Sequence, residues 1–391
     1  MRYVKPYYFE QFKCAAHKCP DTCCAGWQIM IDEDTLEMYM EEKGSFAGRL
    51  AKGIDWAEGS FRQQDGRCAM LNEDNLCDLV ISMGEDCLCE TCHRYPRHVE
   101  EFEGLREWSL SLSCPVAAHM ILEAEEPLGF LAEEADLQDP LEEEFEDFDL
   151  LLFTQLEDAR KVLFRMATDR SRTMEERLWL ILEMAQQMQS CVDEDRLFDM
   201  DELIASYEGK VGCVAACGGN RDIQEHGDRF SDSSRFRELR KQFAVFERLE
   251  RLREEWSYVI TQAQDTLYRE EDVYLNIRRR FRMEYVDTAQ QKEQWEKFQE
   301  NLIVFFLYTY FCGAVYDDWI YTKAALAVFS LLFIEEFIMC RWYLSEGQIS
   351  LQECVELAYR YAREVEHSDE NLNALEEWLQ ENPLLLKGTE H

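Results

Sequence analysis

Cysteine is the residue most able to do chemistry in this 391-residue chain, and ten of its sixteen cysteines lie between Cys14 and Cys114. Short spacings occur within groups of these cysteines, and long gaps separate the groups. A polydentate thiolate site has this form, because local turns preset neighbouring ligands and tertiary folding brings the others to them. The pattern therefore predicts a metal centre. The ten cysteines are Cys14, Cys19, Cys23, Cys24, Cys68, Cys77, Cys87, Cys89, Cys92 and Cys114.

The spacing favours an iron–sulfur cluster over zinc. A zinc ribbon carries paired CxxC units, and only Cys89 and Cys92 have that spacing. Four thiolates around an iron–sulfur cluster tolerate irregular spacing. The CxxxCxxC spacing of radical S-adenosylmethionine enzymes is incomplete, because Gly26 stands where a cysteine should follow Cys19 and Cys23. Zinc and metal-free thiols stay open as alternatives.

Histidines and the remaining cysteines have simpler interpretations. His17 and His93 lie among the thiols and are candidates to replace one of them, although an isolated histidine is more often a surface or core residue. Cys312, Cys340 and Cys354 lie in apolar, helical surroundings, where a free cysteine behaves as a small hydrophobe. We expect these three in the core.

The charge balance restricts the class of partner. Asp and Glu total 80 against 41 Lys and Arg, which gives a formal charge of -39. This field repels nucleic acid and anionic membranes, so no nucleic-acid partner is expected. It favours a basic, lysine-bearing partner, although acidic surfaces also serve solubility alone.

The chain has no predicted export signal or membrane span. Its N-terminus lacks the continuous apolar core of a secretory signal, which favours a cytoplasmic protein. The apolar runs 302–315 and 324–334 are shorter than the roughly 18 residues that cross a bilayer, so we expect buried helices there. Without export, disulfides are disfavoured, which supports a metal role for the thiols.

More than one packed unit is expected at this length. Residues 1–122 are expected to form the cysteine-rich unit, in which Gly26 lets the chain turn into a WQIMID strand. HVEEFEGLREWSLSLS alternates apolar and polar residues around Gly104, which predicts a β-hairpin. Residues 123–149 contain thirteen acidic residues and no Lys or Arg, which indicates a linker, or alternatively a lysine-attracting patch.

Residues 150–391 are expected to form a helical domain. Thr173 with Glu176 and Ser350 with Glu353 have the spacing of capping boxes. Apolar residues recur every three or four positions from Phe236 to Trp256, which predicts one long amphipathic helix. The expected fold is therefore mainly α, with an N-terminal cysteine-rich metal-binding unit that contains a small hairpin, followed by a C-terminal helical bundle.

Five motifs occur in the order and approximate spacing of a known family. They are KCPDTCCAGWQIMID, CAMLNEDNLC, TCHRYPR, SLSLSCP and ENLIVFFLYTYF. In these motifs the chain resembles the flagellin lysine N-methylase (FliB) family, which is related to a broader cysteine-cluster domain that chelates iron or zinc. The resemblance implies S-adenosylmethionine-dependent methylation of flagellin lysines in a bacterial cytoplasm, with a [4Fe-4S] cluster, or zinc as the alternative, in the cysteine-rich unit.

The resemblance also implies a set of candidate metal ligands, although one cluster needs only four thiolates. Cys114 matches a motif as well, whereas Cys87 and Cys89 are additions beside Cys92. The candidate ligands are Cys14, Cys19, Cys23, Cys24, Cys68, Cys77 and Cys92, and the preferred subset is Cys23, Cys24, Cys68, Cys77 and Cys92.

The methyl-donor site is not evident from the residues. Doubly wound methyltransferases carry a glycine-rich turn after the first strand, and here the glycines of VGCVAACGGN follow no convincing strand. We interpret that segment as a loop or helix end. The missing turn keeps a non-catalytic, metal-stabilised binding module open as the alternative function. A zinc-storing or redox-sensing thiol protein is a second alternative.

Lysine methylation also requires a neutral amine, because lysine with a pKa near 10.4 is mostly protonated at neutral pH. Carboxylates and tyrosines are the available bases. Trp27, Tyr95 and Trp108 are candidates to line a channel for a cationic side chain, or simply to cover the metal. Arg94 and Arg97 are candidates to balance thiolate charge or to bind a cofactor carboxylate.

Overall fold

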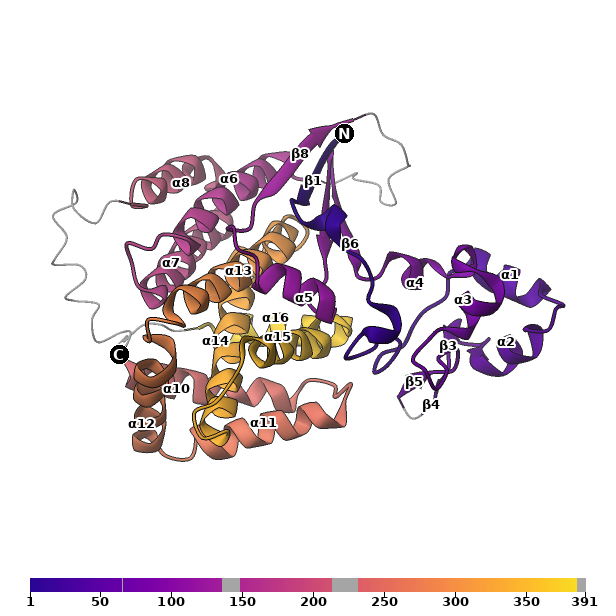
Figure 1. Cartoon of the computed structure of the whole chain (residues 1–391). Helices are drawn as coiled ribbons and strands as arrows, with labels where there is room; N and C mark the ends of the chain where they lie inside the picture. The colour runs from indigo at the N-terminus through magenta and orange to yellow at the C-terminus, as the bar shows by residue number, and fades with distance from the viewer. Residues whose placement is uncertain (65, 136–147, 213–230, 385–391) are drawn as a thin grey trace.

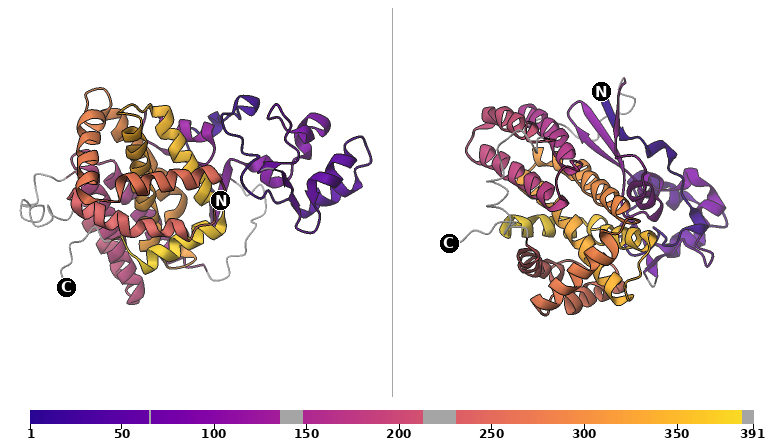
Figure 2. Two further views of the ribbon diagram at one scale, coloured as in Figure 1. Left: turned by 90° about the horizontal axis from the view of Figure 1, so that it is seen from below. Right: turned by 60° about the vertical axis from the view of Figure 1, so that its left-hand side comes forward.

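A computed structural model of the chain describes residues 1–64, 66–135, 148–212 and 231–384. A helical body makes up most of the molecule, and a smaller part formed by residues 27–94, here called the projection, extends from one side of it (Figure 1). Figure 2 shows the same projection standing away from the body when the molecule is seen from below. The mainly helical fold expected from the sequence is confirmed.

One four-stranded sheet lies at the edge of the body, in the order β6-β7-β1-β8. β1 runs parallel to β7 and antiparallel to β8, while β6 and β7 form the predicted hairpin around Gly104, whose φ is +78°. β8 falls inside the acidic stretch that the sequence suggested was a linker. The strands are β1 (Arg2–Pro6), β6 (Arg97–Phe102), β7 (Leu105–Leu110) and β8 (Phe130–Glu134).

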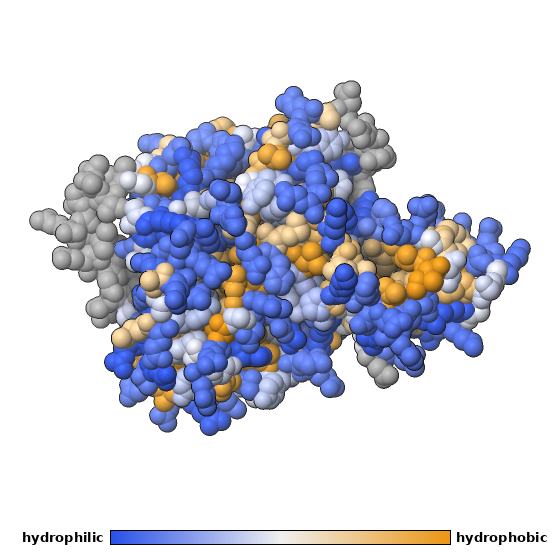
Figure 3. Space-filling view, in the orientation of Figure 1, coloured by the Kyte–Doolittle hydropathy of each residue, from blue (hydrophilic) through white to orange (hydrophobic). Residues whose placement is uncertain are grey.

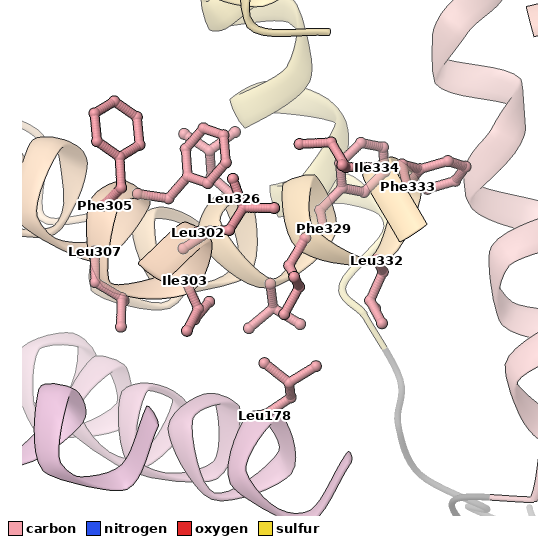
Figure 4. Packing of buried hydrophobic residues seen from close by; sticks show 14 of the residues in the cluster. Leu178, Leu302, Ile303, Phe305, Leu307, Leu326, Phe329, Leu332, Phe333 and Ile334 are labelled. Carbon is pink, nitrogen blue, oxygen red and sulfur yellow. The ribbon is translucent and has the colours of Figure 1, made fainter. Parts of the chain in front are cut away.

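Helix α14 (Ile320–Leu344) forms the centre of the body, and every residue from Ile320 to Cys340 is buried. It packs against α7, α11, α13 and α16. Figure 4 shows Phe329 of α14 and Leu302 of α13 in this apolar packing, with Leu178 of α7 below them. The helices around it are α5 (Pro115–Leu122), α6 (Leu150–Ala167), α7 (Met174–Asp193), α8 (Met200–Glu208), α10 (Asp232–Gln242), α11 (Glu254–Leu267), α12 (Glu271–Phe281), α13 (Lys292–Tyr310), α15 (Leu351–Glu366) and α16 (Asp369–Glu381).

Local sequence signals placed several of these elements correctly. The capping boxes of Thr173 with Glu176 and of Ser350 with Glu353 both form, and they begin α7 and α15. The two apolar runs are largely buried, and Cys312, Cys340 and Cys354 lie in the core as expected. The segment Lys292–Val315 is long and apolar enough to cross a membrane, but 78% of its most apolar window is buried inside the protein.

The single long helix predicted from Phe236 to Trp256 is wrong. The chain leaves α10 at Gln242, makes a short 3-10 turn and begins α11 only at Glu254. Two backbone N–H groups in the break are satisfied from distant parts of the chain: Glu250 N–H donates to Asn371 Oδ1 at 2.6 Å, and Leu252 N–H donates to Glu364 Oε2 at 3.1 Å. These partners replace the helical hydrogen bonds that periodicity alone predicts.

The projection has a small core of its own. Ile29, Ile31, Tyr39 and Leu50 belong to it, while the body core takes in residues on both sides of the projection, including Phe12 and Leu112. The WQIMID strand does not form, because the segment makes only one isolated bridge, from Met30 to Ser60. The elements of the projection are α1 (Glu33–Glu41), α2 (Ala47–Gly53), β2 (Ile54–Asp55), β3 (Ser60–Phe61), β4 (Gln63–Gln64), β5 (Arg67–Cys68), α3 (Asp78–Met83) and α4 (Glu90–Arg94).

The surface agrees with the charge balance of the sequence. The face shown in Figure 3 is mostly hydrophilic over the helical body, and apolar residues gather where the body meets the projection and on the projection itself. The domain limits at residues 122 and 149 stay predictions. Trp27, which packs against the core of the projection, and Tyr95, which packs against the body core, have ring centroids 5.9 Å apart, so the two hydrophobic cores meet at these rings.

Candidate active site where the projection meets the helical body

The N-terminal thiols lie in two neighbourhoods. Five belong to, or pack against, the small core of the projection, and we call them the inner thiols. Backbone pairing brings them near one another, because Cys68 N–H donates to the Cys24 carbonyl at 2.8 Å and Cys77 forms a bridge with Leu71. The inner thiols are Cys24, Cys68, Cys77, Cys89 and Cys92.

The second neighbourhood faces the helical body, and its members are called the junction thiols. Burial, followed by the nearby thiols of Cys19 and Cys14, raises the pKa of Cys114 to about 11. Cys23 has its pKa raised by the adjacent Cys24 side chain, by burial and by Cys114. The Cys23–Cys24 peptide therefore joins the two neighbourhoods. The junction thiols are Cys14, Cys19, Cys23 and Cys114.

The donor chemistry suits a soft metal or an iron–sulfur cluster. All fourteen described cysteines are free thiols. Within the part of the chain that the structure describes, no three His, Cys, Asp or Glu side chains are grouped closely enough to hold one metal ion. His17 and His93 are both exposed. The ligand set therefore stays a prediction, with four of its seven members among the inner thiols and three among the junction thiols.

The loop that carries the paired cysteines is fastened to the body by two arginines. Arg363 of α15 forms an ion pair with Asp21 at 2.6 Å and donates to the Ser113 carbonyl at 2.8 Å. Arg253 reaches Asp21 at 2.9 Å and the Ala25 carbonyl at 2.7 Å. Burial opposes ionisation of Asp21, but the two guanidinium groups lower its pKa.

Gly26 is needed for this close approach. Its φ of +86° is one that other residues rarely adopt, and a Cβ built there would lie 2.5 Å from Arg253 Nε. The glycine that follows the cysteines therefore makes room for an arginine of the helical body. The turn expected at Gly26 is confirmed, although no strand follows it.

A cleft of about 340 Å³ opens beside this loop. Three rings form one of its walls: the Trp27 and His367 centroids are 4.8 Å apart, and Tyr95 packs on His367 at 5.6 Å. Trp27 Nε1 donates to the Cys23 carbonyl at 2.7 Å, so this wall is tied directly to the cysteine loop. Trp108, the third aromatic predicted to form a channel, instead packs on Phe9 at 5.7 Å.

Glu366 lines the cleft at the end of α15. Ser111 Oγ donates to Glu366 Oε2 at 2.5 Å. Oε1 of the same carboxylate is buried and has no hydrogen-bond partner in the described structure. Burial raises the pKa of Glu366 to about 7, although hydrogen bonds from Ser111 and the Ser113 backbone oppose this.

A chain of polar groups orients the aromatic wall. Ser113 Oγ lies 2.8 Å from His367 Nε2 and 3.1 Å from the Tyr95 hydroxyl. Burial, followed by the charges of Arg363 and Arg253, lowers the pKa of His367 to about 3, so its ring is neutral at physiological pH. The wall is therefore uncharged, and the carboxylate of Glu366 lies beside it.

The predicted arginines lie at the edge of the cleft. Arg94 forms an ion pair with Glu90, and the Arg97 guanidinium lies over the Phe12 ring at 5.3 Å. Their proposed roles in charge balance or cofactor binding stay predictions. The segment that contains Cys213, Cys217 and the paired glycines lies outside the described residues.

Sequence reasoning missed Glu366, His367, Ser111 and Tyr310 as cleft residues. A signal was present for Glu366, because it continues the i, i+4 row of Cys354, Ala358 and Ala362 along the buried face of α15. A carboxylate in line with an apolar stripe is unusual enough to mark a candidate site. The other three residues come from distant segments that only the fold brings together.

Comparison with known proteins identifies a family and several relatives of this chain. Residues 160–386 match the family model described as FliB lysine N-methylase C-terminal domain. A 128-residue stretch is 30% identical to the flagellar biosynthetic protein FliU of Salmonella muenchen, covering 30% of this chain and 76% of that protein.

Two proteins named lysine-N-methylase, from Salmonella typhimurium and Salmonella choleraesuis, also match at 30% identity over 128 residues. The matched stretch covers 30% of this chain and only 32% of each of these enzymes. No solved structure matches this chain.

Proposed function

Because the chain belongs to the FliB lysine N-methylase family, we propose that it transfers methyl groups from S-adenosylmethionine to lysine side chains of flagellin. The family implies a methyl donor, and the flagellar relative supports a flagellar substrate. We further propose a bacterial cytoplasmic setting, where flagellin is made before export.

The observation that carries this proposal is the cleft beside Trp27. It combines aromatic walls with a carboxylate and lies against the helical region that matches the family model. Aromatic faces attract ammonium groups, and a carboxylate pairs with them, so the cleft suits a lysine side chain. The overall charge of -39 favours approach of a lysine-bearing partner.

The transfer itself requires alignment and desolvation. A neutral lysine nitrogen attacks the methyl carbon in line with the sulfonium, the C–S bond breaks, and the sulfur keeps the electron pair. A cleft that excludes water holds the amine and the methyl group in this alignment and keeps the amine from being solvated again.

We also propose that the inner thiols hold a [4Fe-4S] cluster, with zinc as the alternative. Cys24, Cys68, Cys77 and Cys92 are predicted ligands within one neighbourhood, and Cys89 is a buried addition to it. A bound cluster supplies a rigid centre that fixes the small core of the projection. Since Trp27 donates to the Cys23 carbonyl, the same loop positions a wall of the cleft.

Mass spectrometry of flagellin co-expressed with this protein tests the function. We expect lysines that gain one, two or three methyl groups, and we expect the gain to vanish with Trp27→Ala but to persist with Cys354→Ala. Binding of flagellin without any gain in mass would instead support the non-catalytic binding module. That alternative is favoured by one observation, because the described strands form a mixed sheet without a doubly wound nucleotide site.

A further inference from the structure

We propose that Glu366 binds the ammonium group of the substrate lysine in the cleft and accepts its proton before methyl transfer. This inference rests on the proposed function, because it assigns the base for that reaction. It also assigns the cleft to the lysine side chain rather than to the methyl donor. Three features of the structure carry it: the free oxygen of Glu366, the surrounding rings and the partners of the nearby cations.

One carboxylate oxygen of Glu366 is available to a ligand. Ser111 holds Oε2 from one side, so the carboxylate has a fixed orientation, while Oε1 is buried without a hydrogen-bond partner in the described chain. A buried acceptor without a partner is costly, and native proteins rarely keep one unless a ligand satisfies it. Because Glu366 lines the cleft, a donor bound in the cleft can satisfy this oxygen.

The rings around Glu366 suit an alkylammonium group. Trp27, Tyr95 and Tyr310 line the same cleft, and Thr309 and Leu372 complete its surface. Aromatic and apolar groups cover the methylene chain of a lysine, and the ring faces attract its charged end. The volume of about 340 Å³ accommodates such a side chain.

The cations near the cleft pair chiefly with other groups. His98 of β6 lies 3.2 Å from Glu100 Oε2, although its charge also lowers the pKa of Glu366. Arg94 of α4 pairs with Glu90, and Arg97 lies over Phe12. On α15 itself, His367 is neutral at physiological pH.

Two more groups complete the titratable surroundings of Glu366. Tyr310 of α13 has its pKa raised, chiefly by burial and then by the Glu366 charge, so it stays a neutral phenol. Asp369 of α16 is exposed at the cleft edge and adds negative charge. The groups that lie against the Glu366 carboxylate are thus neutral, because they are the Ser111 hydroxyl, the Ser113 backbone and the Tyr310 phenol. The negative charge of Glu366 is left for the incoming lysine.

The proton balance is complete. The lysine ammonium gives one proton to the carboxylate of Glu366, which leaves a neutral amine and a carboxylic acid. The amine nitrogen forms a bond to the methyl carbon, and the C–S bond of the sulfonium breaks. The sulfonium becomes a neutral thioether and the nitrogen becomes a methylammonium. Glu366 then releases its proton to solvent, so each transfer produces one proton.

The raised pKa of Glu366 is consistent with its role as the base. A carboxylate with a pKa of about 7 takes a proton readily near neutral pH, and a low-dielectric cleft favours the neutral amine and acid over the ion pair. Glu364 offers a matched control, because its pKa is also raised to about 7 by burial. Its carboxylate accepts the Leu252 N–H at 3.1 Å and does not line the cleft.

The test compares Glu366→Gln with Glu364→Gln in the full-length protein, with flagellin and S-adenosylmethionine as substrates. We expect Glu366→Gln to lower kcat by about a hundredfold at pH 7, which is typical for loss of a general base. The deficit should shrink as pH rises toward the pKa of lysine. Glu364→Gln should keep kcat within about threefold, and Glu366→Asp should retain partial activity with the wild-type form of the pH profile.

Wild-type kcat and pH profile in Glu366→Gln, or an equal loss in both glutamine variants, would overturn the assignment. Binding is measured separately by saturation-transfer NMR with n-butylammonium as the probe and n-butanol as the neutral control. Loss of n-butylammonium binding in Glu366→Gln alone supports the lysine site even if the wild-type protein transfers no methyl group. Wild-type protein that methylates flagellin but binds the probe independently of Glu366 refutes the site and leaves the proposed function intact.

Discussion

At the scale of single residues, buried carboxylates on α15 govern how the junction responds to pH. Glu364 and Glu366 lie two positions apart and face different partners, one in the helical break and one in the cleft. Burial raises the pKa of each to about 7. Both groups therefore prefer to be protonated in the folded chain.

This preference predicts that stability falls as pH rises. Between about pH 4.5 and pH 7 the unfolded chain has released the Glu364 proton while the folded chain still keeps it, so the free energy of unfolding decreases. Glu364 alone contributes a loss of about 3 kcal/mol across this window, and above about pH 7 its effect is constant. Urea denaturation of wild type and Glu364→Gln at pH 5 and pH 8 measures this.

We expect the variant to lose less stability than wild type between the two pH values. The remaining loss reports Glu366 and other groups. An identical pH dependence in both proteins would show that Glu364 has an ordinary pKa in the folded chain.

Sequence reasoning reached part of the site at this scale. Trp27 and Tyr95 were candidates to line a channel for a cationic side chain, because aromatic faces attract ammonium groups, or simply to cover the metal. Both line the cleft. Trp108 was predicted with them, but it packs on Phe9 because neighbouring residues of a strand face opposite sides and Ser109 takes the side of the cleft. Ser111 and Glu366 are 255 positions apart, and no local pattern predicts such a contact.

Among the helices and strands, local sequence signals predicted where α7 and α15 begin but not where every helix ends. The capping boxes of α7 and α15 depend on residues three positions apart, so the sequence displays them directly. The break between α10 and α11 depends on Asn371 and Glu364, more than a hundred positions away. All but one of the apolar residues that suggested a single helix are still buried, which explains why their periodicity misled the prediction.

Asn371 is expected to hold this break in place. Its side chain accepts the Glu250 N–H at 2.6 Å and donates to the carbonyls of Glu250 at 2.8 Å and Glu364 at 2.6 Å. Asn371→Ala should lower the free energy of unfolding by about 3 kcal/mol, because it leaves buried backbone groups without partners. Thermal and urea unfolding measure the loss, and the surface variant Asn276→Ala on α12 serves as the control. A loss below about 1 kcal/mol would show that water or a shifted backbone replaces these bonds.

At the scale of the whole molecule, the two hydrophobic cores set how a metal would affect stability. The body core includes α14 and is continuous with the sheet, whereas the projection has a small core to which the inner thiols belong or against which they pack. A core of that size rarely folds without support from a metal or disulfides, and the described cysteines are free thiols. The sequence predicted a metal unit within the first 122 residues but not that residues on either side of the projection would join the body core.

Removal of the metal should therefore unfold the projection and leave the body folded. Protein prepared without oxygen and treated with a chelator is expected to exchange backbone hydrogens rapidly in α1 and α2, while α14 stays protected. Cys68→Ala should show the same pattern without chelator and should lose bound iron or zinc. Cys340→Ala removes a buried thiol of the body, so it should keep the metal and the protection of the projection. Equal protection of α1 and α2 with and without metal would contradict a structural role for the inner thiols, because their core would then be stable by apolar packing alone.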